Sequence, residues 1–97
     1  MPQVQVIARY TVSEGHEDEV FALLPVLAEA SRAEPGNVSF EVFHALGDAR
    51  DVVLLERYDS PRAFAAHRDS LHFKDLVLRR IAPLLVSRVV TTYEAGE

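Results

Sequence analysis

The chain has 97 residues, a length that fits one domain spanning residues 1–97. It contains no cysteine, which excludes disulfides, thiolate metal sites and thiol nucleophiles, and its formal net charge of −5 argues against a nucleic-acid partner. No apolar stretch approaches the roughly 18 residues of a membrane span, and the opening residues lack the pattern of a signal peptide. We therefore expect a cytoplasmic protein, without membrane contact, that handles a small molecule or another protein.

The first half of the chain predicts a strand, a helix and a second strand. Residues 4–12 (VQVIARYTV) alternate between two faces, which is the pattern of a strand. Over residues 16–33 apolar side chains recur at helical spacing behind an acidic first turn, and Pro25 inside this helix should bend it. The triplet Glu34-Pro35-Gly36 ends the helix, and residues 37–45 (NVSFEVFHA) alternate again as a strand.

The second half predicts a hairpin, a helical region and a final strand. Residues 47–50 suit a turn before a strand at 52–58 (VVLLERY), and Asp59-Ser60-Pro61 is a favourable helix start. A second helical segment is expected over residues 73–82, followed by a last strand over 84–93. The helix that begins near residue 61 is expected to carry three residues on one inward stripe: Phe64, His67 and Leu71.

The predicted order of elements is that of a ferredoxin-like α+β fold, an antiparallel βαββαβ sheet with both helices on one face. If water covered the other face, the strands should alternate cleanly between apolar and polar residues. The strand at 52–58 instead has apolar residues on both faces, and Ile7 and Phe43 fall opposite their strands' main apolar face. This patch predicts a homodimer packed sheet against sheet; the alternative is a monomer with an apolar sheet surface.

Two stretches carry a recognisable pattern, EPGNVSFEVF at 34–43 and VVLLERYDSPRAFAAHRDSLHF at 52–73. They resemble the antibiotic biosynthesis monooxygenase domain family, whose members include small quinol monooxygenases. The matching positions lie in a turn, in the third strand and in the second helix: Glu34, Gly36, Leu54, Glu56, Tyr58, Ala66, His67, Ser70, His72 and Phe73. The resemblance implies a dimeric α+β barrel.

The resemblance implies several activities, because the family includes cofactor-independent oxygenases of dihydroxyaromatics, haem-degrading enzymes, an isomerase of a phosphorylated sugar-derived signal and members without known activity. The chain departs from the family at Tyr58, where many members carry tryptophan, at Leu71 in place of a common proline, and at Asn37, where cysteine is frequent. Haem degradation is not expected, because the first strand offers Ala8-Arg9 in place of an asparagine and no histidine follows Phe73.

His67 and His72 stand five residues apart, which raises the hypothesis of a metal site. Two helical ligands converge at a spacing of four, whereas a spacing of five turns the second ring by about 140° around an ideal helix. A break near Ser70 would bring the rings together, but a further ligand would still be needed, for which His44 and Glu56 are the candidates. We therefore expect no metal and no other cofactor.

The favoured function is a cofactor-independent monooxygenase that oxidises a small hydroxylated aromatic or a quinol with O2. Such a substrate supplies its own electrons once deprotonated, so the protein must remove a proton, hold the anion and exclude water. His67 is the expected base, because it lies on the inward stripe of its helix. The expected substrate-binding residues are the hydrogen-bond donors His72, Asn37 and Tyr58, the ring-lining Phe40, Phe73 and Leu54, and Glu56, which would orient a histidine.

Each assignment has a structural alternative. His67 would be a core residue bonded to a backbone carbonyl, His72 would cap or join helical segments, and Glu56 would pair with an arginine such as Arg88. A second functional hypothesis is a non-oxygenase dimer of the same fold. It would be either an isomerase of a small hydroxyketone, acting through an enediolate, or a small-ligand-binding protein. Oxygen consumption separates the two hypotheses.

Overall fold

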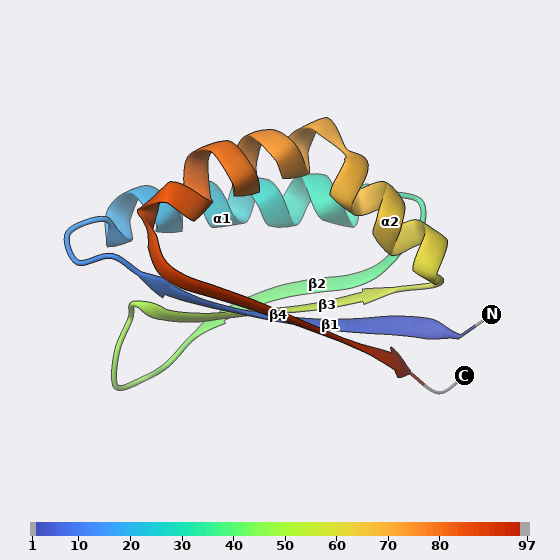
Figure 1. Cartoon of the computed structure of the whole chain (residues 1–97), viewed down its shortest axis with the longest axis horizontal. Coiled ribbons are helices and arrows are strands. Elements are labelled where there is room, and N and C mark those ends of the chain that lie inside the picture. The colour runs from blue at the N-terminus through green and yellow to red at the C-terminus, as the bar shows by residue number, and fades with distance from the viewer. Residues whose placement is uncertain (1, 96–97) are drawn as a thin grey trace.

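A computed structural model describes residues 2–95 of the chain. Four strands form one antiparallel sheet in the order β2-β3-β1-β4, and the helices lie on one face of it (Figure 1). The elements in chain order are β1 (Gln3–Val12), α1 (Glu17–Arg32), β2 (Asn37–His44), β3 (Asp51–Tyr58), α2 (Pro61–Asp69), the π-helix η1 (Phe73–Ile81), the 3-10 turn η2 (Ala82–Leu84) and β4 (Leu85–Ala95). The predicted ferredoxin-like α+β fold is confirmed, and β4 is longer than expected because Ala95 pairs with Gln3.

Local sequence signals explain where the helices begin. α1 follows a turn in which Gly15 adopts a φ of 88°, and the three acidic residues of its first turn suit the positive end of the helix dipole. α1 continues through Pro25. At the start of α2, the Ser60 side-chain oxygen accepts a hydrogen bond from the Ala63 N–H at 3.1 Å, and Pro61 occupies the first position.

Within the residues described, no helix is both long and apolar enough to cross a membrane.

The inward stripe predicted for the second helix holds for its first two members only. Phe64 is partly buried and His67 is 3% exposed, but Leu71 is 86% exposed, so its predicted inward position is wrong. The reason is that α2 ends at Asp69 and the backbone of Ser70 is extended, with φ −67° and ψ 152°. Because the helical spacing is interrupted there, the residue seven positions after Phe64 no longer falls on the same face.

The hydrophobic core lies between the sheet and the helices. β3 buries every second side chain on this face, β1 does so along most of its length, and α1 and η1 add apolar residues at helical spacing. Among the most buried apolar side chains are Val12, Val20, Leu27, Phe40, Leu54, Tyr58, Val77 and Ile81. A carboxyl and an imidazole, Glu56 on β3 and His67 on α2, are buried with them.

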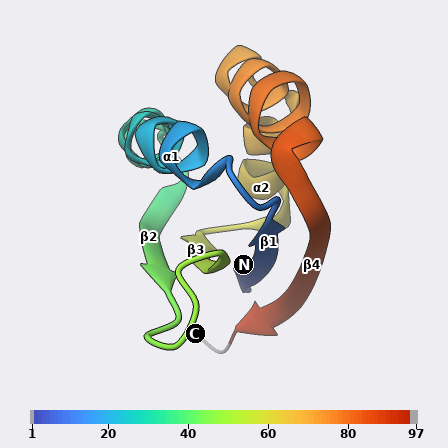
Figure 2. The ribbon, with the colours of Figure 1, turned by 90° about the vertical axis from the view of Figure 1, so that its left-hand side faces the viewer.

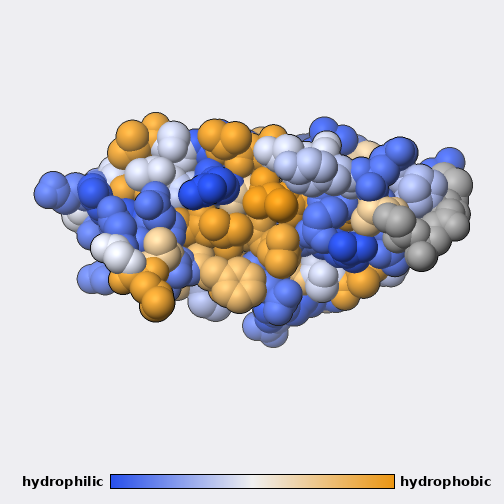
Figure 3. Space-filling model, turned by 90° about the horizontal axis from the view of Figure 1, so that it is seen from below, coloured by the Kyte–Doolittle hydropathy of each residue, from blue (hydrophilic) through white to orange (hydrophobic). Residues whose placement is uncertain are grey.

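The outer face of the sheet carries a continuous apolar area, visible in orange near the centre of Figure 3. On this face Val53 and Leu55 are partly exposed, and half or more of the surface of Phe43, Val89 and Tyr93 is accessible. The prediction that the third strand is apolar on both faces is therefore confirmed. A face of this kind is the usual mark of a surface covered by a partner.

Candidate active site

A cavity of about 340 Å³ lies between the sheet and the helical run from α2 to η1. Figure 2 shows this run above β4, whereas α1 lies above β2. The apolar walls of the cavity include the three predicted ring-lining residues and six other side chains: Val6, Ala8, Leu27, Phe40, Leu54, Phe64, Phe73, Val77 and Val90. The ionisable groups in its wall are Tyr10, Glu56, His67, Arg68 and Arg88. The volume and the mostly apolar lining suit a small aromatic molecule.

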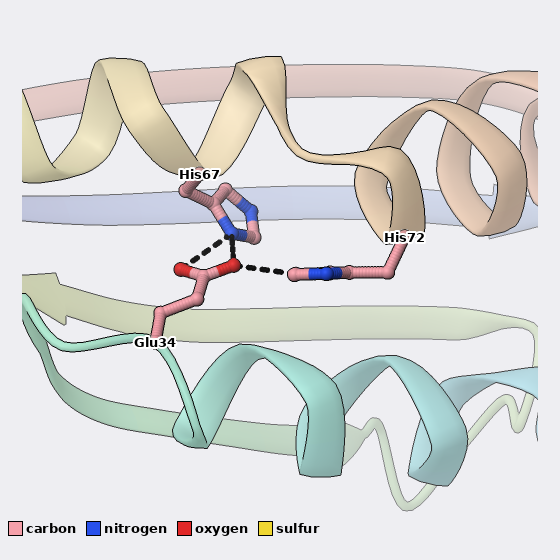
Figure 4. A group of neighbouring side chains, drawn as sticks. All are labelled: Glu34, His67 and His72. Atoms are coloured by element: carbon pink, nitrogen blue, oxygen red, sulfur yellow. Dashed lines mark hydrogen bonds and ion pairs between the residues drawn. The ribbon is translucent and has the colours of Figure 1, made fainter.

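His67 is held in one orientation by Glu34. The Nδ1–H of His67 donates to the Glu34 carboxylate, with distances of 2.8 Å to Oε2 and 3.1 Å to Oε1 (Figure 4). A carboxylate only accepts hydrogen bonds, so this contact places the ring proton on Nδ1 and leaves Nε2 free to accept a proton. His67 thus bonds a carboxylate, and the alternative of a bond to a backbone carbonyl is wrong.

His72 reaches the same carboxylate from the start of the next helical segment. Its Nε2 lies 2.5 Å from Glu34 Oε2, and the His67 and His72 rings are 6.0 Å apart (Figure 4). The extended backbone of Ser70 makes this possible, so the break near Ser70 that would bring the two rings together is present. His72 stands between α2 and η1, as the joining alternative has it, but its side chain makes no capping bond. The Ser70 hydroxyl instead accepts the Phe73 N–H at 3.2 Å.

Gly36 explains how the turn after α1 comes so close to α2. A Cβ at Gly36 would lie 2.3 Å from the Ala63 Cβ, a distance that any larger residue would have to relieve by displacement. The Gly36 carbonyl also accepts the Asp59 N–H at 2.9 Å, which ties this turn to the end of β3. Glu34, two residues earlier, is thereby positioned to reach His67.

Glu34, His67 and His72 also form the donor set that a metal ion would require. One ligand atom from each lies within 4.8 Å of the others, and two imidazoles with a carboxylate suit divalent transition metals. The carboxylate of this set is Glu34, so the expected candidates His44 and Glu56 were wrong; His44 stacks on Phe21 instead. Both imidazole nitrogens already bond the carboxylate, so metal binding would have to replace both hydrogen bonds.

Glu56 faces the other nitrogen of His67 inside the cavity. Its Oε1 accepts the Tyr58 hydroxyl at 2.7 Å and lies 3.7 Å from His67 Nε2, which is too long for a hydrogen bond. Burial raises the pKa of Glu56 to about 7, with the Tyr58 bond opposing the rise and the charge of Glu34 adding to it. Burial also lowers the pKa of His67, against the opposing effect of Glu34. Burial thus favours the neutral form of both groups in this wall.

The predicted site residues separate into two groups. Five of them line the cavity: Phe40, Leu54, Glu56, His67 and Phe73. The other three, Asn37, Tyr58 and His72, lie behind this wall. Tyr58 bonds Glu56, His72 bonds Glu34, and the Asn37 amide donates to the Ser39 carbonyl at 3.1 Å. Any effect of these three on a ligand would act through the residues they hold.

Sequence reasoning missed four residues of this region: Glu34, Phe64, Arg68 and Arg88. The sequence assigns Glu34 to a turn and to the family pattern but gives it no role, and the residue that orients His67 is Glu34 and not the expected Glu56. A signal was present, since Glu34 belongs to the matched E-x-G pattern, and a pattern of that kind in a turn can mark a side chain with a task. The arginines gave no signal, because their neighbours in the chain do not form a basic patch.

Comparison with known proteins shows which family and which proteins the chain is similar to. The family described as antibiotic biosynthesis monooxygenase matches residues 3–78. "Putative monooxygenase Rv0793" of Mycobacterium tuberculosis is 36% identical over 70 residues, covering 72% of this chain and 68% of that protein. "Putative monooxygenase YcnE" of Bacillus subtilis is 32% identical over 53 residues, covering 55% of this chain and 56% of that protein, so the match spans little more than half the length of YcnE.

Solved structures agree in fold over almost the entire chain. The structure of Rv0793 has a TM-score of 0.89 at 29% identity and covers 98% of this chain and 96% of that one. PA3566 from Pseudomonas aeruginosa has a TM-score of 0.91 at 22% identity, covering 100% of this chain and 97% of that one, and shows the common fold. With a family match that extends from β1 into η1, the chain belongs to the antibiotic biosynthesis monooxygenase family.

Proposed function

We propose that this protein is a cofactor-independent monooxygenase that oxidises a small hydroxylated aromatic or quinol with O2. The observation that carries the proposal is the orientation of His67. Its Nδ1–H is fixed on Glu34, whereas its Nε2 faces Glu56, and both residues line the cavity. A base held in this way accepts a proton without first having to change tautomer or rotate.

The reaction starts when the substrate hydroxyl transfers its proton to His67 Nε2. The resulting anion passes one electron to O2, and the two radicals combine to form a C–O bond at a ring carbon ortho or para to the hydroxyl that still carries a hydrogen, which in a quinol is the ortho carbon. His67 returns its proton to the peroxide, and loss of water breaks the O–O bond and removes the C–H proton. In sum, one hydroxyarene and one O2 give one quinone and one water. Exclusion of bulk water protects the anion and the peroxide.

The remaining predicted residues hold the substrate or the base. Phe40, Phe73 and Leu54 pack against the aromatic ring inside the cavity. Tyr58 fixes the carboxyl of Glu56, which faces the substrate oxygen in its protonated form as a hydrogen-bond donor. His72 and Asn37 act from behind the wall, His72 by sharing the Glu34 carboxylate with His67.

The proposal includes a homodimer in the cytoplasm. Two copies joined through the outer sheet face would cover the apolar area that contains Val53, Leu55 and Phe43. A chain without cysteine suits a reducing compartment, since it has no disulfide to form.

The test is oxygen uptake by chelator-treated protein with a panel of quinols and dihydroxynaphthalenes. The His67→Ala variant should lose uptake by about 100-fold or more, the usual contribution of a positioned base. His44→Ala is the matched control, because His44 is exposed, stacks on Phe21 and does not line the cavity, and it should retain the wild-type rate.

Three results would contradict parts of this proposal. Uptake that survives His67→Ala would keep the oxygenase and remove the base. Uptake that disappears on chelation and returns with a divalent ion would make Glu34, His67 and His72 a metal site. The absence of uptake on every compound would favour the second candidate below.

The second candidate is isomerisation of a small hydroxyketone. The observation in its favour is that a carboxyl with a pKa raised to about 7, Glu56, lies 3.7 Å from the unprotonated nitrogen of His67 in one wall. Such a pair can remove a proton from carbon and return one to the neighbouring position of an enediolate. Deuterium from solvent would then enter a hydroxyketone substrate while oxygen remained constant.

A further inference from the structure

The charge in the cavity wall is opposite in sign to the charge of the whole chain. The chain has a formal net charge of −5, yet its cavity presents two guanidinium groups, Arg68 and Arg88, and one carboxyl, Glu56. Even with this carboxyl charged, the wall carries more positive than negative formal charge. A concave site of positive charge on an acidic protein attracts anions locally.

Both arginines are positioned by aromatic rings of the same cavity. The Arg68 Cζ lies 4.6 Å from the centre of the Phe64 ring, and the Arg88 Cζ lies 5.8 Å from the centre of the Phe73 ring. Contact with a ring uses the flat face of the guanidinium and leaves its in-plane N–H donors available. The side chains are thus ordered without their donors being consumed.

The donors of the two arginines lack a strong acidic partner. Among residues 2–95, neither Arg68 nor Arg88 forms an ion pair with a carboxylate, although Arg88 lies beside the Tyr10 hydroxyl. Both side chains are exposed while lining the cavity, so they lie at its mouth. Arg68 comes from α2 and Arg88 from β4, which places them on two different elements around the opening.

We propose that the cavity takes an aromatic substrate that carries a carboxylate, and that Arg68 and Arg88 bind this carboxylate at the mouth. The ring then lies against Phe73 and Phe40, and the hydroxyl points inward to His67. A carboxylate is favoured over other anions because its two oxygens match the planar fork of a guanidinium. This inference rests on the proposed function for the role of His67, but the anion site itself does not require any chemistry.

The test measures binding, without turnover, with a matched pair of probes. 4-Hydroxy-1-naphthoate and 1-naphthol share a ring and a hydroxyl and differ only by a carboxylate, which lies opposite the hydroxyl on the same ring. Calorimetry at pH 7 and low salt should give about tenfold tighter binding of the naphthoate to the wild-type protein, as expected for partly exposed charge-assisted hydrogen bonds. The preference should shrink at high salt, since the arginines are exposed.

Arg68→Gln and Arg88→Gln should each reduce the preference by roughly threefold or more while leaving 1-naphthol binding within about twofold. Arg80→Gln is the control, because Arg80 is an exposed arginine on η1 that does not line the cavity, and it should keep the full preference. Thermal melts verify that the variants are folded.

Equal binding of the two probes, or no binding of either, would overturn the proposal. A preference that persists unchanged in both cavity variants would also overturn it, because the carboxylate would then be held elsewhere. Oxygen uptake with 1,4-dihydroxynaphthalene separates this result from the fate of the proposed function. Uptake without a carboxylate preference would remove the anion site alone, whereas a carboxylate preference without uptake would retain the anion site and remove the oxygenase.

Discussion

Replacement of Glu34 by glutamine tests the orientation of His67 most directly. One oxygen of this carboxylate accepts from His72 at 2.5 Å and from His67 at 2.8 Å, and the other lies 3.1 Å from His67. Glutamine offers one acceptor and one N–H₂ group. If the amide nitrogen takes the place of the shared oxygen, it opposes both ring N–H groups, and His67 must move its proton to Nε2. The base would then be blocked.

The expected loss follows from the bond that is replaced. A hydrogen bond to a charged partner contributes about 1.5–3 kcal/mol, and each 1.36 kcal/mol corresponds to tenfold in rate. Glu34→Gln should therefore lower kcat/KM by roughly 10- to 150-fold, mostly through kcat, while O2 uptake remains measurable. Loss of the carboxylate also removes the influence that raises the pKa of His67 against burial.

A pH profile distinguishes this positioning role from a merely structural one. His67 acts as a base when it is unprotonated, so a lower pKa should move the acid limb of kcat/KM to lower pH in Glu34→Gln. Oxygen-electrode rates measured across about pH 5–8 at constant ionic strength give both the loss in kcat/KM and the shift of its acid limb. Glu29→Gln, an exposed position on α1, should change neither. A folded Glu34→Gln protein with the wild-type rate and profile would refute the reasoning.

Three further predictions concern the rest of the structure. Gly36→Ala should lower the free energy of unfolding measured in urea by about 1–3 kcal/mol, because its Cβ would lie 2.3 Å from the Ala63 Cβ. Gly47→Ala is the control, because the space around Gly47 is open, and equal urea midpoints for the two variants would contradict the prediction. Glu56 has a folded pKa raised from 4.5 to about 7, so its stabilising effect is full below pH 4.5 and is lost as the pH rises through 7. The free energy of unfolding should therefore fall by about 3 kcal/mol between pH 4.5 and pH 8 in the wild-type protein and not in Glu56→Gln. The same pH dependence of the urea midpoint in both proteins would count against this. Phe43→Glu should convert a dimer into a monomer in light scattering, whereas a wild-type monomer would disprove the dimer.

The fold and much of the cavity wall were accessible from the sequence because they follow from local periodicity. Alternating residues predicted β1 and β2, and the apolar spacing of α1 predicted its buried face. Residue chemistry and the family resemblance, beyond periodicity, grouped five residues at one site, and all of them line the cavity: Phe40, Leu54, Glu56, His67 and Phe73. Strand alternation and helical spacing are properties of neighbouring residues, so one chain contains the information needed.

The hydrogen-bond partner of His67 could not be predicted from local periodicity. Glu34 and His67 are 33 positions apart, and neither the turn nor the family pattern that contains Glu34 assigns it to His67. Their contact depends on Gly36 passing close to α2, and the contact of His72 depends on the extended backbone at Ser70. The sequence by itself thus determined the elements, their order and which faces are apolar. Only the tertiary structure decided which carboxylate meets which imidazole, because that choice depends on how close two turns and a helix approach one another.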